Sequence, residues 1–98
     1  MSRKKVYLPK ETRAYLSENP GKGNRSQVII FHRWMRRNNL MFGHLTPVHI
    51  EHFWEEQRKL SLAPSTMHVR RCRQHKYLYW LYGRGHLRFV VEPPRLRH

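Results

Sequence analysis

Apolar residues between positions 25 and 39 are spaced as on one side of an α-helix. They recur three, four or seven residues apart: Val28, Ile30, Phe31, Trp34 and Met35. This spacing predicts an amphipathic helix over about residues 25–39. Its other side carries Arg33, Arg36 and Arg37, crowded toward the C-terminal end, where cations suit the helix dipole.

A second helix is predicted over about residues 47–60. Thr46 and Pro47 form a start signal, because a Thr oxygen can cap free backbone amides and Pro loses no hydrogen bond at the first helical position. The apolar stripe of this helix consists of Ile50, Phe53 and Trp54. Its glutamates are expected to turn mostly outward.

The third predicted helix is the longest and covers about residues 65–82. Pro64 disfavours helical angles in the residue before it, and Ser65 or Thr66 can cap the helix that follows. Its most apolar side collects four residues: Met67, Tyr77, Leu78 and Leu81. The glycines at 83 and 85 are typical of a helix C-terminus.

These helices and their short loops predict an all-α fold, a small bundle of three to four helices. Residues 1–24 are polar and basic and are interpreted as a partly flexible arm, with a short helix around 11–18 as an option. The helical domain is expected to span residues 25–92, with a short extended or helical piece at 87–91. Residues 93–98 are interpreted as a C-terminal linker or tail.

The charge balance points to a polyanionic partner. Lys and Arg number 20 against 6 Asp and Glu, which gives a formal net charge of +14, and the chain has no aspartate. Such an imbalance repels itself in a compact state unless a polyanion binds, and nucleic acid is the first candidate. Because three of the six acids lie together in residues 51–56, carboxylate catalysis is nearly excluded.

Metal and thiol chemistry find little support. Cys72 is the only cysteine, so neither a disulfide framework nor a thiolate pair for zinc can form, and we expect it to be a small buried or half-buried filler. His49 and His52 stand one turn apart, but zinc requires three or four convergent ligands. We therefore expect no catalytic residue, no metal, no cofactor and no small-molecule substrate.

No segment approaches the run of about 20 apolar residues that crosses a bilayer. The opening Met-Ser-Arg-Lys-Lys also lacks the apolar stretch of a signal peptide. We expect a soluble protein of a reducing cytoplasm, with no membrane partner.

The stretch from Leu45 to Leu87 carries a recognisable order of residues. It contains, in sequence, Leu45-Thr46, Ile50, Leu62-Ala63-Pro64-Ser65-Thr66-Met67, Tyr77-Leu78, Leu81, Gly85 and Leu87. This order resembles the N-terminal core-binding domain of tyrosine recombinases, the SAM-like helical bundle of phage integrases and related resolvases. The resemblance implies a prokaryotic, nucleoid-associated protein that holds duplex DNA at a recombination site, with other recombinase protomers as further partners.

Two features depart from that family. Arg71 and Gln74 occupy places in the third helix where the family tends to be apolar, so either the helix is rotated slightly or its core edge is unusually polar. The family's catalytic domain would follow this region, and Tyr77, Tyr79 and Tyr82 lack the surrounding Arg and His residues of its nucleophile. We therefore expect no strand cleavage by this chain alone.

The candidate DNA-binding residues lie on the first and third predicted helices. They are basic or hydroxyl-bearing: Arg25, Arg33, Arg36, Arg37, Ser65, Thr66, Arg70, Arg73 and Lys76. A helix N-terminus with free amides binds phosphate, and guanidinium groups reach phosphates or guanine edges. The arginines of the two helices are expected to converge on one side of the bundle, while Arg3, Lys4 and Lys5 form an arm that either follows the DNA backbone or only aids solubility.

Other interpretations remain open from the sequence. Trp34, Trp54 and Trp80 are candidates for stacking on single-stranded bases, although their helical spacing favours a place in the core. An RNA-binding or ribosome-associated helical protein would use the same charge. A protein-interaction module acting on a full-length recombinase is a third alternative.

Overall fold

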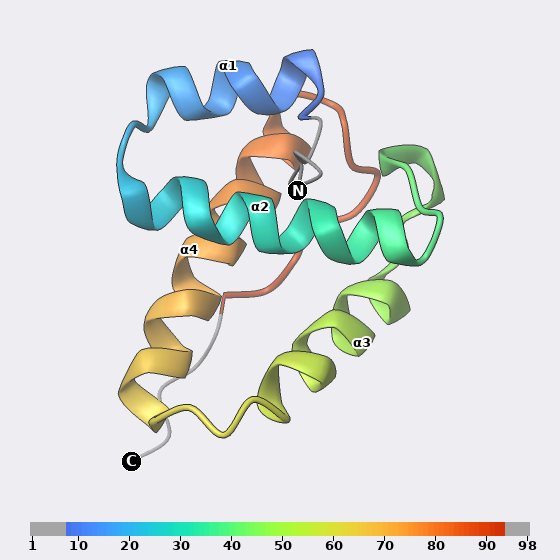
Figure 1. Cartoon of the computed structure of the whole chain (residues 1–98). Helices are drawn as coiled ribbons and strands as arrows, with labels where there is room; N and C mark the ends of the chain where they lie inside the picture. Colours follow the sequence, from blue (N-terminus) through green and yellow to red (C-terminus); the bar gives the residue numbers. More distant parts are fainter. Residues whose placement is uncertain (1–7, 94–98) are drawn as a thin grey trace, which may run out of the picture.

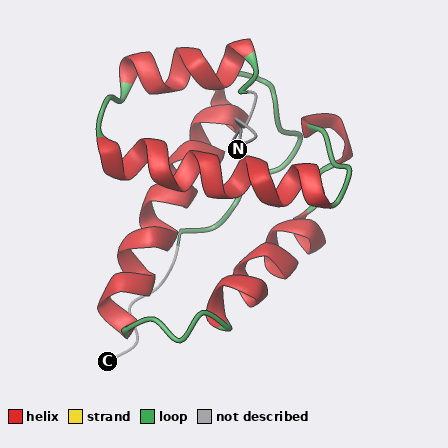
Figure 2. Ribbon diagram, in the orientation of Figure 1, coloured by secondary structure: helices red, strands yellow, loops and turns green. Residues whose placement is uncertain are grey.

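The structure is a computed structural model that describes residues 8–93. These residues form four α-helices, one 3₁₀ turn and no strand: α1 (Lys10–Glu18), α2 (Lys22–Arg37), η1 (Phe42–His44), α3 (Pro47–Arg58) and α4 (Pro64–Gly83). In Figure 1, α2 crosses in front of α4, with α1 above it and α3 below it. Short loops join the helices (Figure 2). The prediction of an all-α bundle is confirmed.

The folded unit begins earlier than the sequence analysis placed it. Helix α1 lies within the segment interpreted as an arm, yet its Thr12 and Tyr15 are 0% and 1% exposed. The Tyr15 ring contacts Tyr77 and Trp80 of α4, with centroids 4.8 Å and 5.3 Å apart. Because α1 covers these rings, it belongs to the domain. The predicted basic arm at residues 3–5 and the tail at 94–98 lie outside the described residues.

The core joins side chains from all four helices and from the segment after α4. The predicted apolar residues of α2 and α3 are buried as expected, except for Ile30, which is half-buried: Val28, Phe31, Trp34, Met35, Ile50, Phe53 and Trp54. Phe53 of α3 is fully buried, with its ring 5.1 Å from those of Phe31 and Trp34. This aromatic cluster packs α3 against α2 and so fixes the position of α3 in the bundle.

Helix α4 buries a narrower side than the sequence predicted. Tyr77, Leu78 and Leu81 are buried, whereas Met67 is half-buried. The helix ends in a left-handed Gly85 (φ 80°), and the amide of His86 donates to the carbonyl of Leu81 over 2.8 Å. This geometry satisfies a carbonyl of the last turn, as in a Schellman motif.

Cys72 does not fill the core. It lies on the exposed side of α4, and its Sγ is 3.4 Å from the His68 Nε2 one turn earlier. The prediction of a buried or half-buried Cys72 was wrong, because the buried positions of α4 are 74, 77, 78 and 81, which place residue 72 on the opposite side of the helix.

The segment after α4 returns along the bundle without forming a helix or strand. Leu87 and Val91 are buried and Phe89 is half-buried. The Val91 carbonyl accepts a hydrogen bond of 2.8 Å from the His75 ring. Of the two forms predicted for residues 87–91, the helical one is wrong.

A buried polar network connects α1, α2 and α4. The Tyr77 hydroxyl lies 2.7 Å from both Thr12 Oγ1 and His32 Nε2, and Thr12 Oγ1 lies 3.2 Å from His32 Nε2. Burial lowers the pKa of His32 to about 4, so the ring is neutral in the folded protein at neutral pH. Burial also raises the pKa of Tyr77. The network therefore joins three helices without burying a charge.

This network predicts a loss of stability in mild acid. The unfolded chain protonates His32 near its ordinary pKa of 6.5, whereas the folded chain does so only near pH 4. The stabilisation is thus complete above about pH 6.5 and is lost as the pH falls toward about 4, a difference of about 3 kcal/mol. Urea unfolding followed at about pH 7 and about pH 4.5 measures it.

Two histidine variants separate this effect from general acid sensitivity. His32→Gln should flatten the pH dependence of the free energy of unfolding, because the replacement does not titrate. His68→Gln, at a position on the outer part of α4, should keep the full pH dependence. An equal pH dependence in His32→Gln and the wild type would contradict the assignment.

Candidate nucleic-acid interface

Two helices of the bundle carry no acidic residue. Helices α2 and α4 contain neither Asp nor Glu, and their cations are Lys22, Arg25, Arg33, Arg36, Arg37, Arg70, Arg71, Arg73 and Lys76. The acidic residues of the chain lie on α1, on α3 and at Glu92. Since α2 packs directly across α4 (Figure 1), the two helices form one acid-free layer.

The outer half of α2 presents a stripe of three predicted residues. Arg25 and Arg36 are separated by about three helical turns and so project along one line, with Arg33 beside them. All three are exposed, and none of them forms an ion pair within residues 8–93. Their guanidinium groups therefore face solvent from the side of α2 that is turned away from the core.

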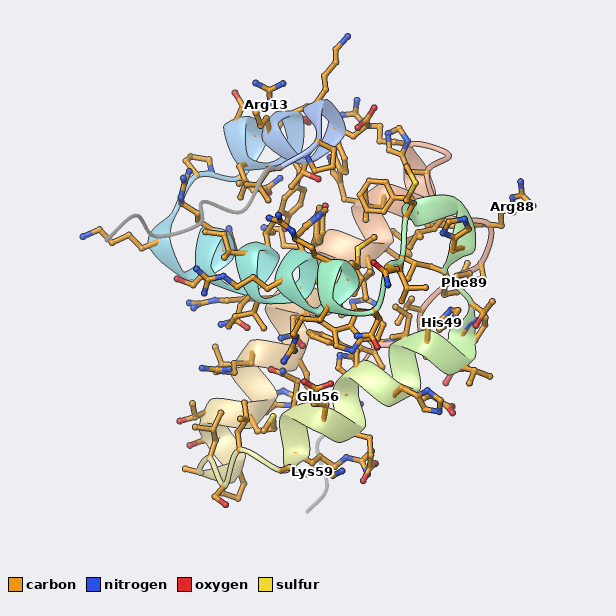
Figure 3. All side chains as sticks on the ribbon, turned by 45° about the vertical axis from the view of Figure 1, so that its right-hand side comes forward. Arg13, His49, Glu56, Lys59, Arg88 and Phe89 are labelled. Carbon is orange, nitrogen blue, oxygen red and sulfur yellow. The ribbon has the colours of Figure 1, made fainter. Side chains whose placement is uncertain are left out.

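Arg37 is directed elsewhere. Its Nη2 lies 2.8 Å from Glu56 Oε1 on α3, and both side chains are exposed. Figure 3 shows Glu56 on the side of α3 that faces α2. An exposed pair of this kind contributes at most about 1 kcal/mol, so Arg37 can exchange Glu56 for a phosphate at little cost.

The predicted cations of α4 separate into different environments. Arg73 reaches the start of α2, where its guanidinium group packs against the backbone of Gly23. Arg70 is half-buried and donates to Gln57 of α3 over 3.5 Å. Lys76 is exposed. The structure thus brings Arg73 to the start of α2, whereas Arg70 and Arg37 contact α3.

The start of α4 differs from the prediction in detail. The N-cap position is Ala63, with Pro64 as the first helical residue and no side-chain cap. Ser65 and Thr66 lie within the first turn and are exposed, so the prediction that one of them caps α4 was wrong. The amides at this end remain open to an anion.

The two departures from the recombinase pattern have a structural explanation. The Arg71 guanidinium group lies over the Trp54 ring, 4.6 Å from its centre. Gln74 is 2% exposed and takes part in a buried cluster with two other glutamines. The edge of the core at these two positions is therefore polar.

The glutamine cluster was not predicted, and it fixes the helices that carry the cations. Gln74 Nε2 donates to Gln27 Oε1 of α2 over 3.0 Å and to Gln57 Oε1 of α3 over 3.5 Å. Gln74 Oε1 accepts from Trp54 Nε1 over 3.2 Å. Gln74 stood out in the sequence as a polar residue at an expected apolar place, but nothing in the sequence identified Gln27 and Gln57 as its partners. Together they hold α2, α3 and α4 at one crossing.

The histidines and tyrosines singled out earlier have other roles. His49 Nδ1 accepts from the Thr46 amide over 3.1 Å and completes the cap of α3, while His52 is exposed. Within residues 8–93, no group of three or more His, Cys, Asp or Glu side chains converges as a metal site. Tyr77 is buried in the network with Thr12 and His32, and its raised pKa makes it a poor nucleophile.

None of the helices in the described part of the chain is long and apolar enough to cross a membrane.

Comparisons with models of protein families, with curated protein sequences and with solved structures find no match to this chain. The case for a function therefore depends on the residues and their arrangement.

The glutamine cluster generates a stability prediction. Gln74→Leu keeps most of the side-chain volume. It leaves the Trp54 indole N–H without its acceptor and the side-chain oxygen of Gln27 without its donor. Each unsatisfied group costs about 1–3 kcal/mol, so the free energy of unfolding should fall by about 2 kcal/mol or more. Urea denaturation measures the change.

Cys72→Ser is the matched control, since it alters an exposed residue on the same helix two positions away. It should change the free energy of unfolding by less than about 0.5 kcal/mol. A Gln74→Leu variant as stable as Cys72→Ser would show that the cluster does not hold the crossing.

Proposed function

We propose that this chain is a duplex-DNA-binding domain of the tyrosine recombinase type, with a SAM-like core-binding fold. It grips DNA mainly through phosphate contacts from α2 and α4, with limited base readout in the major groove, and does not cleave strands by itself. The acid-free layer of α2 and α4 is the observation that carries this proposal.

The distribution of charge favours a long polyanion over a small ligand. The described ion pairs connect Arg37 to Glu56, Arg58 to Glu55 and Arg84 to Glu18, and they leave the outer stripe of α2 uncompensated. Neutralising several phosphates releases condensed counterions, which drives association with DNA. A stripe about three turns long on one helix suits the regular spacing of phosphates along a duplex.

The residues that carry the family resemblance occupy structural positions, which supports the proposal. Leu45 and Leu87 are buried, and Thr46 Oγ1 accepts from the His49 amide at the start of α3. Ile50 is buried on α3, and Gly85 adopts the left-handed conformation just after the end of α4. These residues of the resembling order thus lie at a cap, a helix end and core contacts, whereas residues 63–66 of that order are exposed.

The proposal predicts strongly salt-dependent binding that resides on α2. The double variant Arg33→Gln/Arg36→Gln should weaken binding to a duplex of about 20 base pairs by tenfold or more at about 50 mM salt. The slope of log affinity against log salt should become shallower by about 0.9 for each phosphate that the variant no longer neutralises. Mobility-shift titrations at several salt concentrations measure both quantities.

The control removes the same charge from other surfaces. Arg13 on α1 and Arg88 after α4 are exposed and project away from the bundle (Figure 3), so Arg13→Gln/Arg88→Gln should retain most of the affinity. An equal decrease of affinity in the two double variants would show that binding depends on the net charge of the protein and not on a surface of α2. Stronger competition by structured RNA than by duplex DNA would favour the RNA-binding alternative instead.

A further inference from the structure

Helix α4 bears a row of aromatic rings on the side turned away from α2. His75, Tyr79 and Tyr82 follow one another at helical spacing, and we call them the aromatic stripe. Their ring centres are 6.0 Å apart between His75 and Tyr79 and 6.4 Å apart between Tyr79 and Tyr82. His75 is half-buried, whereas Tyr79 is 55% exposed and Tyr82 is 40% exposed. The two tyrosines therefore leave the stripe open to a ligand.

The stripe contrasts with the other aromatic residues of the same helix. Tyr77 is buried against Tyr15 and Phe31, and Trp80 packs on Tyr15 and beneath the Arg84 guanidinium group. Those rings stabilise the bundle, whereas Tyr79 and Tyr82 expose much of their surface to solvent. Exposed tyrosines in a row are typical of surfaces that bind flat or amphipathic partners.

The positive charge beside the stripe favours an anionic partner. Helix α4 has no acidic residue, and Lys76 is exposed within one turn of Tyr79. The nearest carboxylate along the adjoining segment is Glu92, which lines the groove against α3 together with Glu51 and Glu55. An anionic strand with flat bases satisfies both the rings and the lysine.

The spacing of the rings also suits unpaired bases. A stacked strand rises by about 3.4 Å per nucleotide, so two nucleotide steps cover about 6.8 Å. The two ring separations in the stripe lie close to that length, and because the rings are tilted by 35° and 51° to one another, each ring would stack on a base of its own. Aromatic side chains stack on bases of any sequence, because every base presents a π-face.

We propose that the aromatic stripe of α4 binds unpaired bases of single-stranded nucleic acid. This inference rests on the proposed nucleic-acid binding of α2 and α4 and adds a second surface to it. The duplex contacts the cations of α2 and α4, while an unpaired strand lies along the aromatic stripe of α4.

The test compares three fluorescent probes of equal length, about 15 nucleotides, by anisotropy at low salt. They are single-stranded oligothymidylate, an abasic phosphodiester strand and a DNA duplex. The full chain should bind oligothymidylate more tightly than the abasic strand, because only the former offers bases. Equal binding of these two probes would overturn the proposal without any variant.

Substitutions then locate the effect. Tyr79→Ala/Tyr82→Ala should weaken oligothymidylate binding by about tenfold or more and leave the abasic strand and the duplex unaffected. Tyr79→Phe/Tyr82→Phe should retain binding, because the rings remain. Val69→Ala, at a 47% exposed position on the same helix, is the matched control and should bind as the wild type does.

The duplex probe separates this inference from the proposed function. Weaker duplex binding by Arg33→Gln/Arg36→Gln tests the α2 surface, and weaker oligothymidylate binding by the tyrosine variant tests the stripe. Absence of duplex binding by the wild type would overturn the proposed function while the tyrosine comparison still decides the stripe. Wild-type affinity of the folded Tyr79→Ala/Tyr82→Ala variant for oligothymidylate would overturn the stripe alone.

Discussion

The bundle depends on packing α2 against α4 although neither helix carries a negative charge. Ion pairs between the two are impossible, so neutral groups form the centre of their contact, and the Arg73 guanidinium group packs against the Gly23 backbone at its edge. Phe31 meets Tyr77, His32 meets the Tyr77 hydroxyl, and Gln27 meets Gln74. His32 adds no charge to this contact, because burial lowers the pKa of its ring and keeps the imidazole neutral.

Because of this constraint, the cations of the two helices either face solvent or contact α3. Those at the edge find partners on α3, as Arg37 does with Glu56 and Arg70 does with Gln57. Those on the outer half of α2 form no ion pair with any other group in residues 8–93. Exposed pairs contribute little to stability, so the arrangement of these charges has little bearing on holding the fold.

The sequence predicted the elements better than their contacts. Helices α2, α3 and α4 follow from apolar spacing, from Thr46-Pro47 and from Gly85, which are local signals. Helix α1 was underestimated because its buried side consists mainly of Thr12 and Tyr15, and the hydrogen-bond partners of Thr12 lie 20 and 65 residues away. Cationic residues were predictable as a class, but the directions of Arg37, Arg70 and Arg71 depend on where α3 packs.

The sequence pattern of α4 was the hardest to interpret, because the sides of this helix have different surroundings. One side contacts the core through Tyr77, Leu78 and Leu81, one edge inserts Gln74 between two other helices, and the outer side exposes aromatic rings. A helix with polar residues inside and tyrosines outside lacks a clean apolar side, which is why Cys72 was misplaced. The irregular pattern of α4 reflects its many neighbours within the chain, because α1, α2, α3 and the segment after α4 all contact it.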